Sequence, residues 1–143
     1  MSNTTRVNIL DRIEYDLKNG VSDLLTVEVL RKPTITSVDT VLQPAAFIYP
    51  GPERKIKGGD SRSVIGKENW EWTVFIEVWA MDTDMEALLG SIHTVMYADY
   101  TFNKYAVYSE RESVVMWVVD PDEMQQAMLL EYSVIYRHTL GTM

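Results

Sequence analysis

Imidazole groups are common metal ligands and proton carriers, so the two histidines are the first candidates for chemistry. His93 and His138 lie far apart in the sequence, and neither has a carboxylate neighbour at the spacing of a metal site. His93 falls at the edge of an apolar helical stripe, where a packed or surface histidine is the ordinary outcome. The chain has no cysteine, which removes thiolate nucleophiles and cysteine-ligated zinc. We therefore expect no metal, no cofactor and no catalytic residues, and a protein that is not an enzyme.

Acidic pairs offer a second route to chemistry, as metal ligands or as a general acid and base. Asp82 and Asp84 form an Asp-x-Asp pair, but they precede a predicted helix, where free amides and the helix dipole favour acidic side chains. The segments Glu110-Arg111-Glu112 and Asp120-Pro121-Asp122-Glu123 fall at predicted strand ends or turns, where charge is normally solvated. Capping and solvation explain these carboxylates, and an acid-base pair stays open only through tertiary contacts.

Gly66-Lys67 matches the end of the phosphate-binding loop pattern, but the rest of that pattern is missing. Ser61 stands where the first glycine is required, and Glu68 replaces the magnesium-binding hydroxyl. The segment also leads into a predicted strand, so no helix N-terminus would face a phosphate. Nucleotide binding is therefore not expected.

A polar stretch, residues 51–69, is predicted to be a mobile loop that is locally basic in an acidic chain. One interpretation is a solvated hairpin loop. The other is a charged arm that reaches a neighbouring subunit, an acidic partner or passing DNA. The candidate contact residues are Arg54, Lys55, Lys57, Arg62 and Lys67.

The polar face of the strongest predicted strand, residues 70–81, carries more aromatic side chains than a solvated face needs. Phe75 and Trp79 alternate there with Glu71 and Glu77. A monomer with its helices on the other face would expose both rings, whereas a subunit interface would bury them. We therefore predict self-association, with Phe75 and Trp79 at the subunit interface.

Length and composition favour one folded, acidic domain. The 143 residues are 46% hydrophobic, which is enough for one core, and the formal charge of -8 argues against wrapping nucleic acid. The chain has no apolar run long enough to span a bilayer, and its first residues lack the apolar segment of a signal peptide. We expect a protein that meets no membrane and stays in the cytoplasm where it is made.

The first half of the sequence predicts one amphipathic helix followed by three strands. Apolar residues recur at helical spacing over residues 3–18, before Asn19-Gly20. Strands are predicted at residues 25–30, 45–49 and 70–81, and Pro50-Gly51-Pro52 is expected to end the second. The apolar face of the third strand is formed by Trp72, Val74, Ile76, Val78 and Ala80.

The second half begins with Thr83-Asp84-Met85-Glu86, which is typical of a capping box, with the Thr83 hydroxyl as the cap. The helix that follows should run to about residue 99, and strands are predicted at residues 105–108, 114–119 and 128–137. This order indicates an α+β fold as a single domain, residues 1–143. The sheet should be mainly antiparallel, with about five strands and two amphipathic helices packed on one face. The apolar face of the last strand is formed by Met128, Leu130, Tyr132, Val134 and Tyr136.

Four features of the chain form one pattern. They are the N-terminal helix, the segment Pro44-Ala45-Ala46-Phe47-Ile48-Tyr49 before a charged loop, the strand at residues 70–81 that leads directly into a helix beginning with Thr-Asp, and the final strand Glu131-Tyr132-Ser133-Val134-Ile135-Tyr136-Arg137. This order of elements and its hydrophobic pattern resemble the tail-terminator, or tail-completion, proteins of long-tailed bacteriophages, including the minor tail protein U group. The resemblance extends over nearly the whole chain and depends on pattern, not on a single motif.

This resemblance implies an α+β virion protein that assembles as a hexameric ring on the head-proximal end of the tail tube. Such a ring would end tube polymerisation and offer a joining surface to the head. The implied partners are further copies of the chain, the tail tube protein and the head-tail connector or neck protein, with genomic DNA only in transit through the channel. The basic loop is then a candidate for the channel lining or for the contact with the tube.

Two other functions fit the sequence. A neck or head-completion protein would bind the portal or adaptor instead of the tail tube. A small cytoplasmic enzyme or ligand-binding α+β domain would form a deep pocket from Trp70, Trp72 and Trp79 with scattered carboxylates. Strongly shifted pKa values in a deep pocket would favour the enzyme or ligand-binding domain, whereas flat, self-complementary or head-to-tail contact surfaces would favour a ring.

Overall fold

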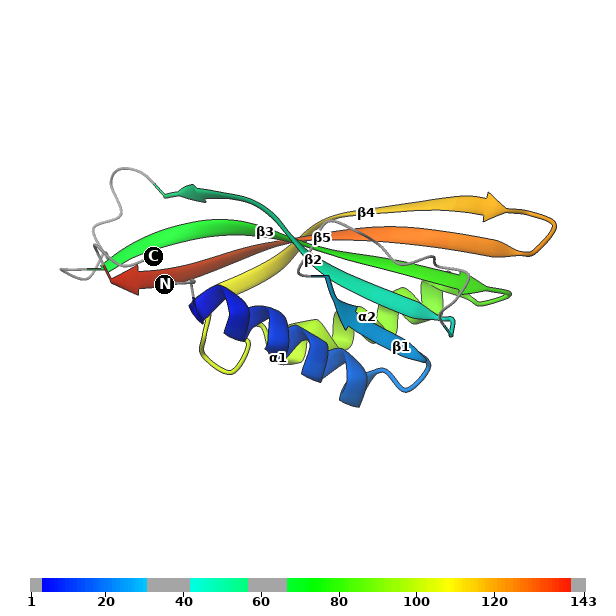
Figure 1. Cartoon of the computed structure of the whole chain (residues 1–143), viewed down its shortest axis with the longest axis horizontal. Helices are drawn as coiled ribbons and strands as arrows, with labels where there is room; N and C mark the ends of the chain where they lie inside the picture. Colours follow the sequence, from blue (N-terminus) through cyan, green and yellow to red (C-terminus); the bar gives the residue numbers. More distant parts are fainter. Residues whose placement is uncertain (1–3, 31–41, 57–66, 140–143) are drawn as a thin grey trace.

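The computed structural model describes residues 4–30, 42–56 and 67–139. Over these residues the order of elements is α1 (Thr4–Gly20), β1 (Thr26–Val29), β2 (Ala45–Lys55), β3 (Lys67–Met81), α2 (Met85–Ala98), β4 (Tyr108–Asp120) and β5 (Gln125–Thr139). The strands form one sheet in the order β1-β2-β3-β5-β4, in which β1 and β2 are parallel and every other pair is antiparallel. Both helices lie against the same face of this elongated sheet (Figure 1). The predicted α+β fold is confirmed.

The long ladder between β3 and β5 sets the two faces of the sheet. The two strands pair in one continuous register from Lys67↔Thr139 to Met81↔Gln125. Because side chains alternate along a strand, paired residues share a face. The two apolar faces predicted from the sequence therefore meet on the helix side, where all ten of their side chains are buried.

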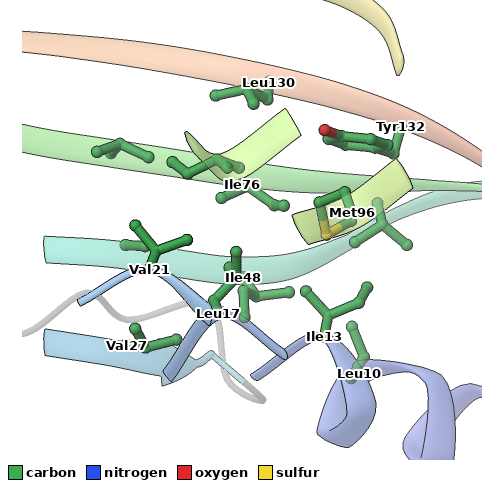
Figure 2. Close-up of a cluster of buried hydrophobic side chains, with 14 of the residues drawn as sticks. Leu10, Ile13, Leu17, Val21, Val27, Ile48, Ile76, Met96, Leu130 and Tyr132 are labelled. Carbon is green, nitrogen blue, oxygen red and sulfur yellow. The ribbon is translucent and has the colours of Figure 1, made fainter. Parts of the chain in front are cut away.

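The core fills the space between this face and the helices (Figure 2). Ile13 and Leu17 of α1 point toward Ile48 of β2, while Ile92 and Met96 of α2 pack in the same cluster. Burying each large apolar side chain stabilises the fold by roughly 1.5–3 kcal/mol relative to leaving it in water. Both helices are therefore held against the sheet by the apolar stripes from which the sequence predicted them.

A polar network fixes the start of α1 to the sheet. The guanidinium of Arg6 lies 4.4 Å from the ring centroid of Trp72, and it also forms an ion pair with Glu53 at 3.3 Å. The Tyr136 hydroxyl donates a hydrogen bond to the same Glu53 carboxylate at 2.7 Å. Trp72 and Tyr136 are fully buried and pack edge to face, so this network closes one end of the core.

The second strand and the basic segment differ from their predicted bounds. β2 does not end at Pro50-Gly51-Pro52 but continues to Lys55, with a register shift between Pro50 and Glu53. Such a shift allows residues without a backbone donor to sit in a strand without breaking it. The predicted loop at residues 51–69 was therefore too long, because residues 51–55 belong to β2 and residues 67–69 to β3. Residues 57–66 lie outside the described part.

The cap of α2 also differs from the prediction. Asp84 is the N-cap, and its side chain accepts a hydrogen bond from the Ala87 amide at 3.1 Å. The Thr83 hydroxyl instead donates to the carbonyl of Met81 at 2.8 Å, so it does not cap the helix. Both residue types are good caps, and the bend after β3 decides which one is in place.

The strand predicted at residues 105–108 was wrong for all but its last residue. Phe102, Asn103 and Lys104 adopt φ angles of 48°, 57° and 70°, so the chain makes a left-handed turn after α2. β4 begins only at Tyr108 and then runs to Asp120, with register shifts against β5 between Arg111 and Ser113 and between Val118 and Asp120. The strand predicted at residues 114–119 is the second half of this longer strand.

Two carboxylates share one arginine where α1 meets the end of α2. Arg12 Nε lies 2.8 Å from Asp99 Oδ2 and 3.3 Å from Asp16 Oδ1. Burial of Asp16 raises its pKa to about 7, and the neighbouring Asp99 adds to this increase. Burial alone would raise the pKa of Asp99, but hydrogen bonds with Asp16, Arg12 and the Asn103 amide lower it below its usual value. The two acids therefore differ in charge state over a wide pH range.

We expect Asp16→Asn to reduce the pH dependence of stability. The folded protein binds the Asp16 proton more tightly than the unfolded chain does, so this group stabilises the fold below about pH 4, and that contribution is lost as pH rises through about 7. Urea denaturation at pH 5 and pH 8 should show that the variant loses less stability over this interval than the wild type, by at least about 1 kcal/mol. The exposed Glu28→Gln variant should behave as the wild type, and equal pH dependence in Asp16→Asn would contradict the assignment.

Candidate assembly surfaces

The face of the sheet opposite the helices is covered by no described helix or strand. The register places Ala127 of β5 between Trp79 of β3 and Trp117 of β4. Ala45 of β2 extends the same row on the other side of Trp79. In the next row, Leu129 lies between Glu77 and Val115. This open face is therefore largely apolar along two adjacent rows that cross the sheet.

Phe75 and Trp79, the predicted interface residues, both lie on this open face and are half-buried. The Phe75 ring packs against Tyr49 at 5.3 Å between centroids. Gly51 makes this packing fit, because a Cβ on it would lie 2.6 Å from a Phe75 ring carbon. The structure therefore places the two rings on the face where the sequence expected them, and their role in an interface stays a prediction.

A single carboxylate organises the aromatic groups of the open face. Glu77 accepts hydrogen bonds from Trp79 Nε1 at 2.6 Å and from the Tyr49 hydroxyl at 3.2 Å. Burial, together with the Glu77 charge, raises the pKa of Tyr49 to about 12. Trp79 is thus held in one orientation by a charged acceptor, so its ring is prearranged on the surface.

The five predicted basic residues are placed only in part. Arg54 and Lys55 are exposed at the end of β2, and Arg54 Nε forms an ion pair with Glu71 at 2.6 Å. Lys67 is the first residue of β3, while Lys57 and Arg62 lie outside the described residues. Arg54 and Lys55 lie at the same end of the molecule as the start of β3 (Figure 1). Their contact role stays a prediction.

The pocket expected from three tryptophans does not form. Trp72 is fully buried in the core, and Trp70 packs against that core from the same face of β3. Trp79 points to the opposite face, because it differs from the other two by an odd number of positions. The three rings therefore cannot line one cavity.

The free edge of the sheet is a feature that the sequence did not predict. β4 is the last strand in the sheet order, and no described strand pairs with its outer side. Its apolar run is exposed on both faces, with exposed fractions of 55% for Val115, 38% for Trp117 and 60% for Val118. A long apolar edge strand is a strong site for association. A run without alternation also fits a central strand, so only the topology reveals it as an edge.

A groove of about 520 Å³ lies between the end of α2 and the start of β4. His93, Tyr97, Tyr100 and Tyr108 form a chain of ring contacts along it, with centroid distances of 6.0–6.5 Å. Arg111 also lines this tyrosine groove and forms no ion pair in the described part of the chain. These residues are scattered in sequence, and no local spacing marks them.

Tyr132 contributes to the same groove from β5. It is 2% exposed, and its hydroxyl has no hydrogen-bond partner among the described residues. Burial raises its pKa to about 12, while the Arg111 charge acts in the opposite direction. An aromatic wall beside an unpaired guanidinium can hold an acidic group that carries apolar neighbours.

Among residues 4–30, 42–56 and 67–139, no group of three or more histidine, aspartate or glutamate side chains could hold a metal ion. Asp84 of the Asp-x-Asp pair is engaged as the helix cap. His93 is exposed beside Tyr97.

Within the described residues, neither helix has the length and apolar character needed to cross a membrane.

Comparison with known proteins finds a likeness in structure alone. Neither a protein family nor a curated protein sequence matches the chain. In fold the chain is similar to a chain of a solved structure described as "Virion of native gene transfer agent (GTA) particle". The TM-score is 0.52 over 96% of this chain and 100% of that chain, at 8% sequence identity. At this identity the likeness establishes a common fold, one that a virion component also has.

Proposed function

We propose that this chain is a structural protein of a phage-like virion and, more specifically, a tail terminator that closes the head-proximal end of a tail tube as a hexameric ring. The observation that carries the proposal is the sheet, whose open face and β4 edge expose apolar side chains that the described chain does not cover. The fold shared with a chain of a gene transfer agent virion supports the virion setting. The order of elements that resembles the tail-terminator proteins supports the more specific assignment.

Apolar surface of this kind favours assembly, because association removes it from water and a monomer leaves it exposed. On the open face Val115 lies beside Leu129, and Ala127 separates Trp117 from Trp79, so a partner would cover a continuous apolar patch. Apolar burial contributes about 25 cal/mol for each Å² removed from water. A ring of copies would remove such a patch from water on every subunit. No catalytic step is part of this function.

A ring can end the growth of a tube because its two ends differ. One end would bind the last ring of tube subunits, and the other would present a surface to which no tube subunit binds. Arg54 and Lys55 lie at one end of the long axis, and the β4-β5 turn lies at the other. The basic end would meet the tube or the channel, where DNA passes during transfer.

The first experiment is negative-stain imaging of the purified protein, alone and mixed with tubes assembled from its cognate tail tube protein. We expect rings, or caps on one end of each tube that prevent further growth when more tube protein is added. Binding to the head-tail connector without binding to tubes would instead favour a neck protein. Absence of rings, caps and connector binding would contradict the proposed function.

Replacing Trp79 with glutamate should weaken association and leave the monomer folded. The new carboxylate would lie beside Glu77 on the open face, where it would disfavour burial against another copy. Tube capping should fall by at least about tenfold, which corresponds to about 1.4 kcal/mol. Trp79→Phe keeps an aromatic ring and should cap as the wild type. Unfolding of Trp79→Glu to the extent seen in the core variant Trp72→Ala would instead assign Trp79 to the core.

Removing the basic charge of Arg54, Lys55 and Lys57 together should impair tail completion or head joining. The ion pair of Arg54 with Glu71 is exposed, so its loss should change the free energy of unfolding by less than about 1 kcal/mol. The measurement is the yield of complete virions when the Arg54→Ala/Lys55→Ala/Lys57→Ala variant replaces the wild type. The Lys18→Ala/Arg31→Ala/Lys32→Ala variant removes the same charge elsewhere and should give a normal yield. A normal yield from the first variant would exclude a contact role for this segment.

A further inference from the structure

Two surfaces hold most of the exposed apolar side chains of the described chain. We define the β4 arm as residues 115–124, which comprise the second half of β4 and the turn into β5. Of fifteen exposed large apolar residues among those described, six lie on this arm and three line the tyrosine groove. The six on the arm are Val115, Met116, Trp117, Val118, Val119 and Met124. The three in the groove are Tyr97, Tyr100 and Tyr108.

The two surfaces carry opposite unpaired charge. Asp122 and Glu123 are exposed on the tip of the arm and form no ion pair in the described part of the chain. In the groove, Arg111 is likewise unpaired. The carboxylate of Glu110 also lines the groove, where it accepts a hydrogen bond from the Tyr108 hydroxyl at 3.1 Å. An acidic tip with apolar neighbours and an aromatic groove with a free guanidinium are complementary.

The arm and the groove of one chain cannot meet. Arg111 and Asp120 both lie on β4, nine residues apart, so about 30 Å separates the groove from the start of the turn at the usual rise per residue. Figure 1 shows that the β4-β5 hairpin leads away from the end of α2 that borders the groove and extends past the helices. Contact between the two surfaces therefore needs a second copy.

We propose that the β4 arm of one copy docks in the tyrosine groove of the next. Asp122 and Glu123 then face Arg111, while Pro121 and Met124 pack on the rings of Tyr97, Tyr100 and Tyr108. Each copy uses two different surfaces, so the contact is head-to-tail and repeats until a ring closes. This inference rests on the proposed function for the claim that the ring closes; the contact itself is a property of the chain.

A charge exchange tests the contact directly. The Arg111→Glu groove should repel the acidic tip of a wild-type arm. The Asp122→Lys/Glu123→Lys arm should be repelled by Arg111 of a wild-type groove. Asp120 is left unchanged because its carboxylate accepts hydrogen bonds from the amides of residues 122 and 123 and holds the turn. Each variant alone should need at least about tenfold more protein to assemble on tube ends, whereas a mixture of the two should recover wild-type assembly. The chain that carries all three changes should recover it as well.

The matched control is Asp23→Lys/Glu28→Lys, which makes the same change of charge at two exposed positions away from the arm. It should assemble as the wild type. Assembly of Arg111→Glu at the wild-type concentration, or failure of the mixture to recover, would overturn the proposed contact.

Cross-linking gives a second readout that does not require closed rings. The sequence has no cysteine, so every disulfide joins two introduced thiols. Tyr97→Cys and Glu123→Cys proteins that carry different tags, mixed and oxidised, should form the disulfide-linked heterodimer at several times the yield of the heterodimer from a Tyr97→Cys and Asp23→Cys mixture. Equal yields would overturn the contact.

The two proposals fail in different ways. Tube caps from the wild type that are unaffected by the charge exchange would reject the arm-and-groove contact and leave the terminator function intact. A high Tyr97-Glu123 cross-link yield without caps on any tube would support the contact and reject the terminator function.

Discussion

The pairing of β3 with β5 is the constraint on which the rest of the structure depends. A shift of this ladder by one residue would move Trp72, Tyr136 and their neighbours from the core to the open face. The register therefore decides both what the helices can cover and what they leave exposed. Arg6 and Glu53 reinforce it at one end, where they contact the two buried aromatic rings. Core and assembly surfaces are two results of the same alignment.

Alternation in the sequence predicted the two strands of this ladder and their apolar faces, because both are apolar on every second residue, but it did not predict that they pair with each other. It could not predict the edge, since the residues of β4 that follow Ser113 are apolar without alternation and fit a central strand equally well. The sequence also predicted the wrong N-cap for α2, because Thr83 and Asp84 are both good capping residues. The structure has Asp84 as the cap, while Thr83 is bonded to Met81. The tyrosine groove was beyond reach because Tyr97, Arg111 and Tyr132 come together only through the sheet order.

The net charge of -8 does not show where the unpaired charges of the molecule lie. Glu77 on the open face is bonded to Tyr49 and Trp79, and Asp99 at the helix contact is paired with Arg12. Asp122 and Glu123 at the tip of the arm form no ion pair in the described part of the chain. A uniformly acidic protein would repel its own copies, whereas a chain that concentrates free acid at one place and a free guanidinium at another can attract them in one orientation. Association would then be directional and sensitive to ionic strength.

The position of β5 between β3 and β4 has a consequence for how the protein is made. The central ladder cannot form until the segment ending at Thr139 has left the ribosome, although β3 is complete at Met81. During that interval the apolar residues of β3 have β2 and the helices as neighbours but lack their main strand partner. Pairing over such a separation raises the contact order and slows folding. The finished sheet should therefore form late, after synthesis of nearly all of the described chain, and the nascent protein should depend on protection from aggregation until then.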